Sequence, residues 1–156
     1  MNLTEHGLYI VKDDYFRDFP SSGWLQNKGE SRPHYFAVTD SSGTTWMIPL
    51  SSRVEKYRNL INKIEEQRGT GKCVYYHIGV VSGHESAFVI SDMFPVTPKY
   101  IRRPYTVNQI PYVMRDDKLI RKLRSKALKY IRLLEQGALQ DKNHVLQIRK
   151  KLSGTK

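Results

Sequence analysis

The sequence contains very little cysteine. Cys73 is the only one among 156 residues, so the chain cannot form an internal disulfide. A lone cysteine is typical of proteins in a reducing compartment, and we expect the chain to be cytoplasmic. No run comes close to the roughly 18 apolar residues that a membrane span requires, and the first residues lack the basic-then-apolar pattern of a signal peptide. The sequence therefore predicts no membrane partner.

Recognisable metal-binding and nucleotide-binding patterns are also missing. The five histidines and the cysteine are scattered along the chain without metal-ligand spacing, so we expect neither a metal site nor a cofactor. The chain has no Gly-x-x-x-x-Gly-Lys-Ser/Thr loop, no Gly-x-Ser-x-Gly elbow and no His-Glu-x-x-His helix. These absences argue against nucleotide hydrolysis of the P-loop kind, against serine-hydrolase chemistry and against zinc peptidase chemistry.

Acidic residues are few compared with basic ones. The chain has 15 Asp and Glu against 26 Lys and Arg, which gives a net charge of +11. This charge favours a polyanionic partner, most simply RNA or DNA, with an acidic membrane surface or an acidic protein as the competing choices. Ten tyrosines, several of them among basic residues, suit base stacking, although tyrosines in this number are also ordinary core and edge-strand residues.

The length predicts one domain over residues 1–156. Apolar alternation predicts strands, and apolar residues at helical spacing predict helices. The predicted strands are 7–12, 34–39, 44–48, 73–81 and 86–90, and the main predicted helices are 53–67, 117–136 and 141–152. Strands with one inserted helix, followed by a basic helical C-terminus, predict an α+β fold. We expect a small, strongly curved antiparallel sheet rather than alternating βαβ units.

The segment 46–58 is the sharpest local signal, because an apolar strand there runs through a proline and two serines into a basic helix. Ser52 and Glu55 have the spacing of a capping box, which predicts that Ser52 is the N-cap. A helix N-terminus offers unpaired N–H groups to an anion, and Arg53 and Lys56 add positive charge. The segment is either the seat of a phosphate or an ordinary helix start.

Metal-free cleavage of RNA needs three things from a protein. A group must orient or deprotonate the ribose 2′-hydroxyl, donors or cations must hold the phosphate, and an acid must protonate the leaving 5′ oxygen. Ser51, Ser52 and Lys56 are candidates for the donors and the charge. Tyr9 and His34, on strands expected beside 46–50, are further candidates, unless Tyr9 is a half-buried strand residue and His34 a surface histidine. Tyr9, Lys56 and His34 all remain candidates for the acid.

Basic residues gather in the loop 20–33, near residue 100 and on the helix 117–136. Charges on helices usually form a solvated face, but consecutive helices with few acids also suit a phosphate backbone. The predicted RNA-contacting residues are Lys28, Arg32, Lys99, Arg102, Arg103, Arg121, Lys122, Lys126, Lys129 and Arg132. His77 and His84 lie in a predicted hairpin, and we expect them to be structural.

Several of these segments together resemble the RNase toxins of type III toxin–antitoxin systems, the ToxN/AbiQ group, with the CptIN branch closest and the TenpIN branch second. The resemblance rests on 7–11, on 46–52 with the following Lys56 and Tyr57, on 92–97 and on the basic helix after 116. It implies a curved barrel like that of the MazF and Kid toxins. It also implies a metal-independent endoribonuclease that leaves 2′,3′-cyclic phosphate ends on cellular or phage RNA.

The same resemblance implies roles and partners. The family ties two hydroxyls and a following lysine to cleavage; Ser51 and Ser52 match the hydroxyls, and either Lys56 or Arg53 takes the place of the lysine. The implied inhibitor is a small repeat RNA that folds as pseudoknots, is cut by the toxin from a longer precursor, and alternates with the toxin in closed rings. Two other hypotheses stay open: a non-catalytic RNA- or DNA-binding protein, and a module that binds an acidic protein.

Overall fold

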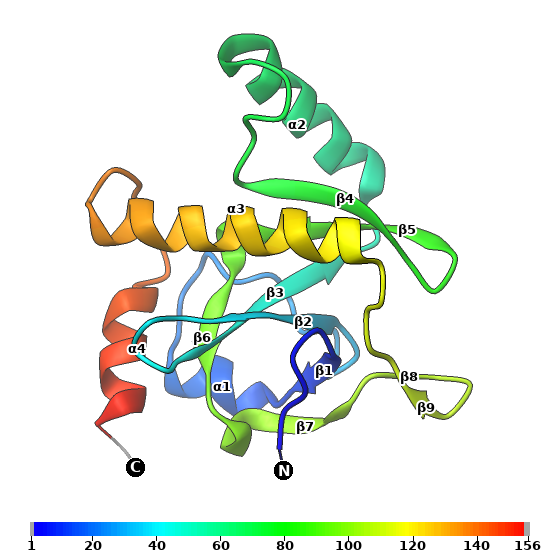
Figure 1. Ribbon diagram of the computed structural model, residues 1–156. Coiled ribbons are helices and arrows are strands. Elements are labelled where there is room, and N and C mark those ends of the chain that lie inside the picture. The colour runs from blue at the N-terminus through cyan, green and yellow to red at the C-terminus, as the bar shows by residue number, and fades with distance from the viewer. Residues whose placement is uncertain (1, 155–156) are drawn as a thin grey trace.

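The computed structural model describes residues 2–154 and has an antiparallel sheet as its centre (Figure 1). The strands of this sheet are β1 (Leu8–Val11), β2 (Pro33–Thr39), β3 (Thr45–Ser51), β4 (Tyr76–Val81), β5 (His84–Val89), β6 (Phe94–Val96) and β7 (Ile101–Pro104). They follow the order β4-β5-β3-β2-β1-β7, with β6 also paired to β3. The predicted α+β class and the antiparallel pairing are confirmed. The path is open from β4 to β7, so the closed barrel is not confirmed.

The central strand β3 has two different partners along one side. Its first half, Thr45–Met47, pairs with β6, and its end, Leu50–Ser51, pairs with β5. Pro49 falls between these two pairings, where a residue without an N–H is tolerated. The prediction that this strand ends at residue 48 is wrong, because the pairing with β5 continues it through the proline to Ser51.

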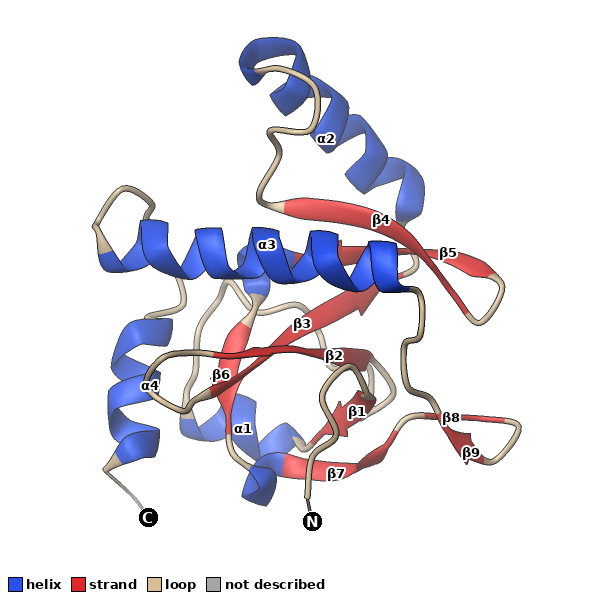
Figure 2. Ribbon diagram, in the orientation of Figure 1, coloured by secondary structure: helices blue, strands red, loops and turns tan. Residues whose placement is uncertain are grey.

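In the described part of the chain, four α-helices lie around the sheet (Figure 2). They are α1 (Asp13–Asp18), α2 (Val54–Arg68), α3 (Asp117–Glu135) and α4 (Val145–Ser153), and two 3₁₀ turns, η1 (Ile90–Asp92) and η2 (Pro98–Tyr100), connect strands. The long helix α3 agrees with its prediction. The Asp116 carboxylate accepts hydrogen bonds from the N–H groups of Lys118 and Leu119, and Gly137 ends the helix with a φ of 73°.

The segment after β7 forms a small hairpin, with strands β8 (Thr106–Val107) and β9 (Ile110–Pro111). Asn108 and Gln109 connect them with φ values of 52° and 67°, the geometry of a two-residue hairpin turn. Residues 105–114 thus contain a short hairpin and not one continuous strand. The segment places Tyr105 and Thr106 near the end of β3, and these residues line one cleft together with Ser51.

The turn between β2 and β3 is tied to α4 through Asp40. Its carboxylate accepts hydrogen bonds from Trp46 Nε1 at 2.8 Å and from Arg149 Nη1 at 2.9 Å. Burial raises the pKa of this carboxyl, but hydrogen bonds from Ser42, Trp46, Thr44 and Arg149 outweigh burial and bring the pKa down to about 2. The charged carboxylate therefore stabilises the fold.

We expect Asp40→Asn to lower the free energy of unfolding at pH 7 by about 1–3 kcal/mol, because hydrogen bonds to a charged acceptor are lost. The folded pKa lies below the ordinary value of 3.8, so this stabilisation is present above about pH 4 and disappears as the pH falls towards 2. Urea denaturation followed by circular dichroism, repeated across that range, measures the difference. A difference that does not change with pH would contradict the assignment.

Candidate active site and basic groove

The end of β3 opens into a cleft of about 350 Å³. Parts of the chain that are distant in sequence form its walls: the starts of β1 and β2, the end of β3, the β4–β5 hairpin and the segment 105–107. The polar residues in its lining are Ser51, Ser52, Ser82, His84, Ser86, Tyr105 and Thr106. Both predicted serines thus line a hollow that is large enough to receive part of a nucleotide.

The two serines have different surroundings. Ser51 is only 6% exposed, and its Oγ accepts a hydrogen bond from the Arg53 N–H at 3.2 Å. Ser52 is exposed, and its hydroxyl forms no hydrogen bond with the described residues. The predicted capping box is wrong: Arg53 is the N-cap of α2, and it makes no side-chain cap bond. Ser51 is still part of β3 through its pairing with β5, and the helix starts only at Val54, so Ser52 is not the N-cap and its hydroxyl is left available.

The two candidate cations, Arg53 and Lys56, lie at the start of α2 but outside the cleft lining. Both side chains are exposed. The Lys56 ammonium is 5.2 Å from the centre of the Tyr57 ring, so it rests against its own helix. Arg53 adjoins Ser52 directly in the chain. Either side chain would have to extend towards the cleft to place its positive charge near a phosphate bound there.

Tyr9 and His34 do not join the serines. Tyr9 is 4% exposed, and its hydroxyl accepts a hydrogen bond from the Thr4 N–H at 2.6 Å in a separate hollow. His34 is 1% exposed and its ring lies against Phe16 and Phe94. Burial first, and then the Arg32 charge, lower the pKa of His34 to about 3, so this histidine is neutral at pH 7. His34 is therefore a core residue, and the surface alternative is wrong as well.

Arg32, one of the predicted RNA contacts, does not lie on the surface. Its side chain is buried, with 6% exposure. The guanidinium donates from Nε to the Gln26 carbonyl at 2.6 Å and from Nη1 to the Leu50 carbonyl at 2.7 Å. Burial lowers the pKa of this guanidinium. Arg32 fastens the long loop to the residue that directly precedes Ser51, so it positions the end of β3.

We expect Arg32→Met to lower the free energy of unfolding by about 2–4 kcal/mol, because the buried Leu50 carbonyl and the partly buried Gln26 carbonyl each lose a charged donor. The methionine fills similar space without donating hydrogen bonds. Arg103→Met is the matched control, since Arg103 is exposed. Urea denaturation of both variants measures the effect. Equal stability of the two variants would show that the buried hydrogen bonds contribute little.

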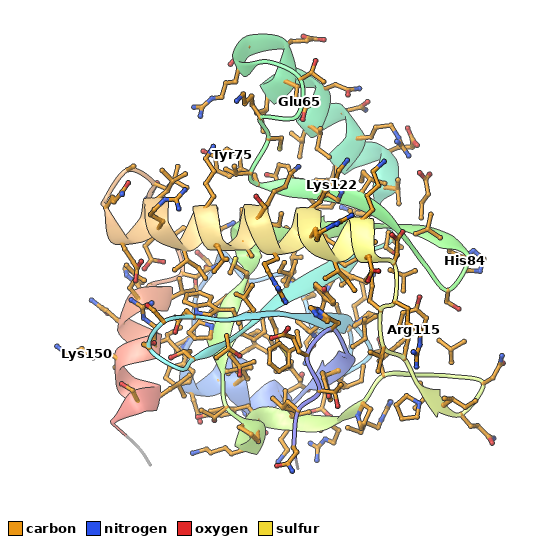
Figure 3. All side chains as sticks on the ribbon, in the orientation of Figure 1. Glu65, Tyr75, His84, Arg115, Lys122 and Lys150 are labelled. Atoms are coloured by element: carbon orange, nitrogen blue, oxygen red, sulfur yellow. The ribbon has the colours of Figure 1, made fainter. Side chains whose placement is uncertain are left out.

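A second, larger hollow is a groove of about 760 Å³ around the outer edge of β4. Successive residues of β4 face opposite sides: Ile78 packs on the α2 side, and His77 contacts Lys126 of α3. Gly79 lets α3 approach closely, because a Cβ there would lie 2.7 Å from a methyl group of Leu119. The groove therefore has α2 and α3 as walls and a strand edge between them (Figure 3).

The groove is strongly basic. Its cationic lining residues are Arg58, Lys72, Lys118, Arg121, Lys122, Lys126 and Lys129, and Glu65 is the only acidic residue in the described lining. Four of the predicted RNA-contacting residues of α3 thus gather here. Arg132 is exposed farther along α3 and does not line the groove. Arg58, Lys72 and Lys118 also line the groove, although they were not among the predicted RNA contacts.

Lys126 and His77 meet in this groove, with 3.1 Å between Nζ and Nδ1. Burial lowers the pKa of both groups, and the charges of Lys126 and Lys122 help to bring the pKa of His77 down to about 4. His77 is therefore neutral at pH 7 and accepts a hydrogen bond from the Lys126 ammonium. An anion that binds in the groove would therefore contact the Lys126 ammonium, whose position is fixed by its hydrogen bond to His77.

The remaining predicted RNA contacts lie outside the lining of the groove. Lys28, Lys99, Arg102 and Arg103 are exposed. Arg102 is already paired, since its Nε lies 2.8 Å from an oxygen of Glu30. The predicted basic set therefore divides into a groove and a scattered group. Only the groove combines a hollow with a continuous cationic lining.

The cleft also contains residues that sequence reasoning missed, namely His84, Ser86, Tyr105 and Thr106. A usable signal existed for two of them. The Ser82-Gly83 turn starts a strand in which positions 84 and 86 share one face. Nothing local in the sequence indicates that this face meets the end of β3.

Residues 2–154 lack both a group of metal ligands and a membrane-spanning helix. No three His, Cys, Asp or Glu side chains come together as ligands for a metal ion in this range. None of the helices described there is both long and apolar enough to cross a membrane.

No protein-family model and no curated protein matches the sequence. Solved structures do match the fold. One, from work on a processed non-coding RNA that regulates a bacterial antiviral system, is 16% identical with a TM-score of 0.56, over 87% of this chain and 90% of that one. Another is AbiQ, a lactococcal anti-phage endoribonuclease of the type III toxin–antitoxin system; it is 13% identical with a TM-score of 0.58, over 83% of this chain and 82% of AbiQ. At these identities, the likeness shows that the chain shares their fold.

Proposed function

We propose that the chain is the endoribonuclease toxin of a type III toxin–antitoxin system, acting as a single domain in the cytoplasm. The observation that carries this proposal is the cleft at the end of β3, whose lining includes both Ser51 and Ser52. The fold shared with AbiQ, an anti-phage endoribonuclease, supports the proposal. Within this group of toxins we propose the CptIN branch, with the TenpIN branch as the second choice.

The reaction we propose is metal-independent transesterification. The ribose 2′ oxygen attacks the adjacent phosphorus, the bond from phosphorus to the 5′ oxygen breaks, and the products carry a 2′,3′-cyclic phosphate and a 5′-hydroxyl. The exposed Ser52 hydroxyl can donate a hydrogen bond to the phosphate as its charge builds up. Arg53 or Lys56 can supply positive charge from the start of α2, while Ser51 keeps this turn in shape.

The partner we propose for the basic groove is the inhibitor RNA. Seven cations with one acid provide the sequence-independent attraction that a phosphate backbone needs. We propose that this RNA is a small repeat folded as a pseudoknot, that the toxin cuts it from a precursor, and that toxin and RNA alternate in closed rings. The structure that shares this fold comes from a system regulated by a processed non-coding RNA.

The test is a short incubation of the purified chain with a mixed RNA pool in EDTA, followed by mapping of the new ends. Discrete cuts with 2′,3′-cyclic phosphates are expected. Intact RNA after incubation with well-folded protein would overturn the proposal and leave the second hypothesis, a basic protein that binds RNA without cutting it. Cuts that require added metal ions would overturn the metal-independent reaction.

A further inference from the structure

His84 shares the cleft with the two serines. Along β5, Ala87 and Val89 pack against Tyr57 of α2, whereas Phe88 belongs to the main core. Because side chains alternate along a strand, positions 84 and 86 point to the same side as Phe88, away from α2. His84 and Ser86 accordingly line the cleft, together with Ser51 and Ser52.

The hairpin that carries His84 is fastened on both sides. Glu85 accepts a hydrogen bond from Arg58 of α2, with 2.8 Å between Oε1 and Nη2. The Ser82 N–H donates to the Tyr112 hydroxyl at 3.0 Å, which ties the turn to the segment after β9. Figure 3 shows His84 at the end of this hairpin. These two contacts fix the hairpin on either side of His84, whose own side chain is exposed.

His84 is also the lining residue best suited to proton transfer. Of the described residues in the cleft, only His84 and Tyr105 have titratable side chains, and imidazole is the side chain that exchanges protons most readily near neutral pH. We propose that His84 is the general acid of RNA cleavage: its protonated imidazole donates a proton to the 5′ oxygen as the bond from that oxygen to phosphorus breaks. This inference rests on the proposed function.

The surroundings favour an acid over a base. A histidine that acts as a base is commonly oriented by a third group such as a carboxylate, but no carboxylate lines the described part of the cleft. The adjacent Glu85 is engaged by Arg58. A bound phosphodiester is an anion, and an anion close to an imidazole favours its protonated form. The protonated form is the one that donates.

The experiment compares two versions of one RNA oligonucleotide that contains a mapped cleavage site. One version has the natural 5′ oxygen, and the other has sulfur in its place; a thiolate leaves without needing a proton. We expect His84→Ala to cleave the oxygen substrate about 10²–10⁴-fold more slowly than the unmodified protein does. On the sulfur substrate, its cleavage rate should be within about tenfold of that of the unmodified protein. His144→Asn is the matched control, since His144 is exposed at the start of α4, outside the cleft.

The possible outcomes distinguish a failure of the His84 inference from a failure of the proposed function. Normal cleavage of the oxygen substrate by His84→Ala would overturn the inference, and so would an equal loss on both substrates. Absence of cleavage by both the unmodified protein and His144→Asn would overturn the proposed function itself, which separates the two failures. Circular dichroism checks folding, and His84→Gln replaces the alanine variant if the latter does not fold.

Discussion

Ser52→Ala is expected to slow RNA cleavage by about 10²–10³-fold, the usual cost of removing one donor that stabilises charge in the transition state. The fold should be unaffected, because Ser52 is exposed and its hydroxyl makes no hydrogen bond to the described residues. It is not the helix cap that its spacing suggests. Single-turnover cleavage of a defined RNA measures the loss, and thermal denaturation confirms the fold.

Ser51→Ala and Ser41→Ala serve as controls for this prediction. Ser51 is buried and accepts a hydrogen bond from Arg53, so its replacement should lower both stability and activity. Ser41 is exposed, lies in the turn before β3 and does not line the cleft, so its replacement should change neither. If Ser52→Ala cleaves RNA as fast as Ser41→Ala, the Ser52 hydroxyl has no part in the reaction.

Reversing two charges in the groove is expected to weaken RNA binding by about 10²-fold or more near physiological salt. The slope of the logarithm of the binding constant against the logarithm of the salt concentration should become shallower by about one for each phosphate contact that is lost. The double variant is Lys122→Glu with Lys129→Glu, both in the groove lining on α3. Both residues are exposed, so the fold should tolerate the change. Fluorescence anisotropy at several salt concentrations measures it, in a Ser52→Ala background that leaves the RNA uncut.

The matched control for the groove is Lys28→Glu with Lys99→Glu. It changes the net charge by the same amount, at exposed residues that do not line the groove. If attraction comes from the groove, the control loses much less affinity than the groove variant. An equal loss in both would mean that RNA responds to the overall charge of the protein, and the groove assignment would be wrong.

The parts of the fold that could be predicted have their signals close together in the sequence. Helix α3 is the clearest case, since its buried stripe, the Asp116 cap and the Gly137 stop all lie within one segment. The β2–β3 hairpin follows from alternation on either side of a short turn. These features depend on contacts between near neighbours, which the order of residues indicates directly.

The parts that could not be predicted depend on contacts between distant segments. The extension of β3 to Ser51 requires β5, which lies more than thirty residues later. Arginine is usually a surface residue, so the sequence does not predict that Arg32 is buried. Its burial depends on the hydrogen bond that it donates to the Leu50 carbonyl in the folded chain. The cleft is the strongest example, because His84 meets the serines only through the pairing of β5 with β3.

The open edge of β4 has a consequence for the protein without RNA. Among residues 2–154, β4 pairs only with β5, so its outer side offers unpaired backbone groups. Such an edge invites a strand of another molecule to add to the sheet, which is a common start of aggregation. Here a second copy would bring the same lysines into the same narrow space, and like charges would oppose its approach. Mutations that neutralise these lysines would therefore weaken the proposed binding of RNA and, at the same time, remove this protection against self-association.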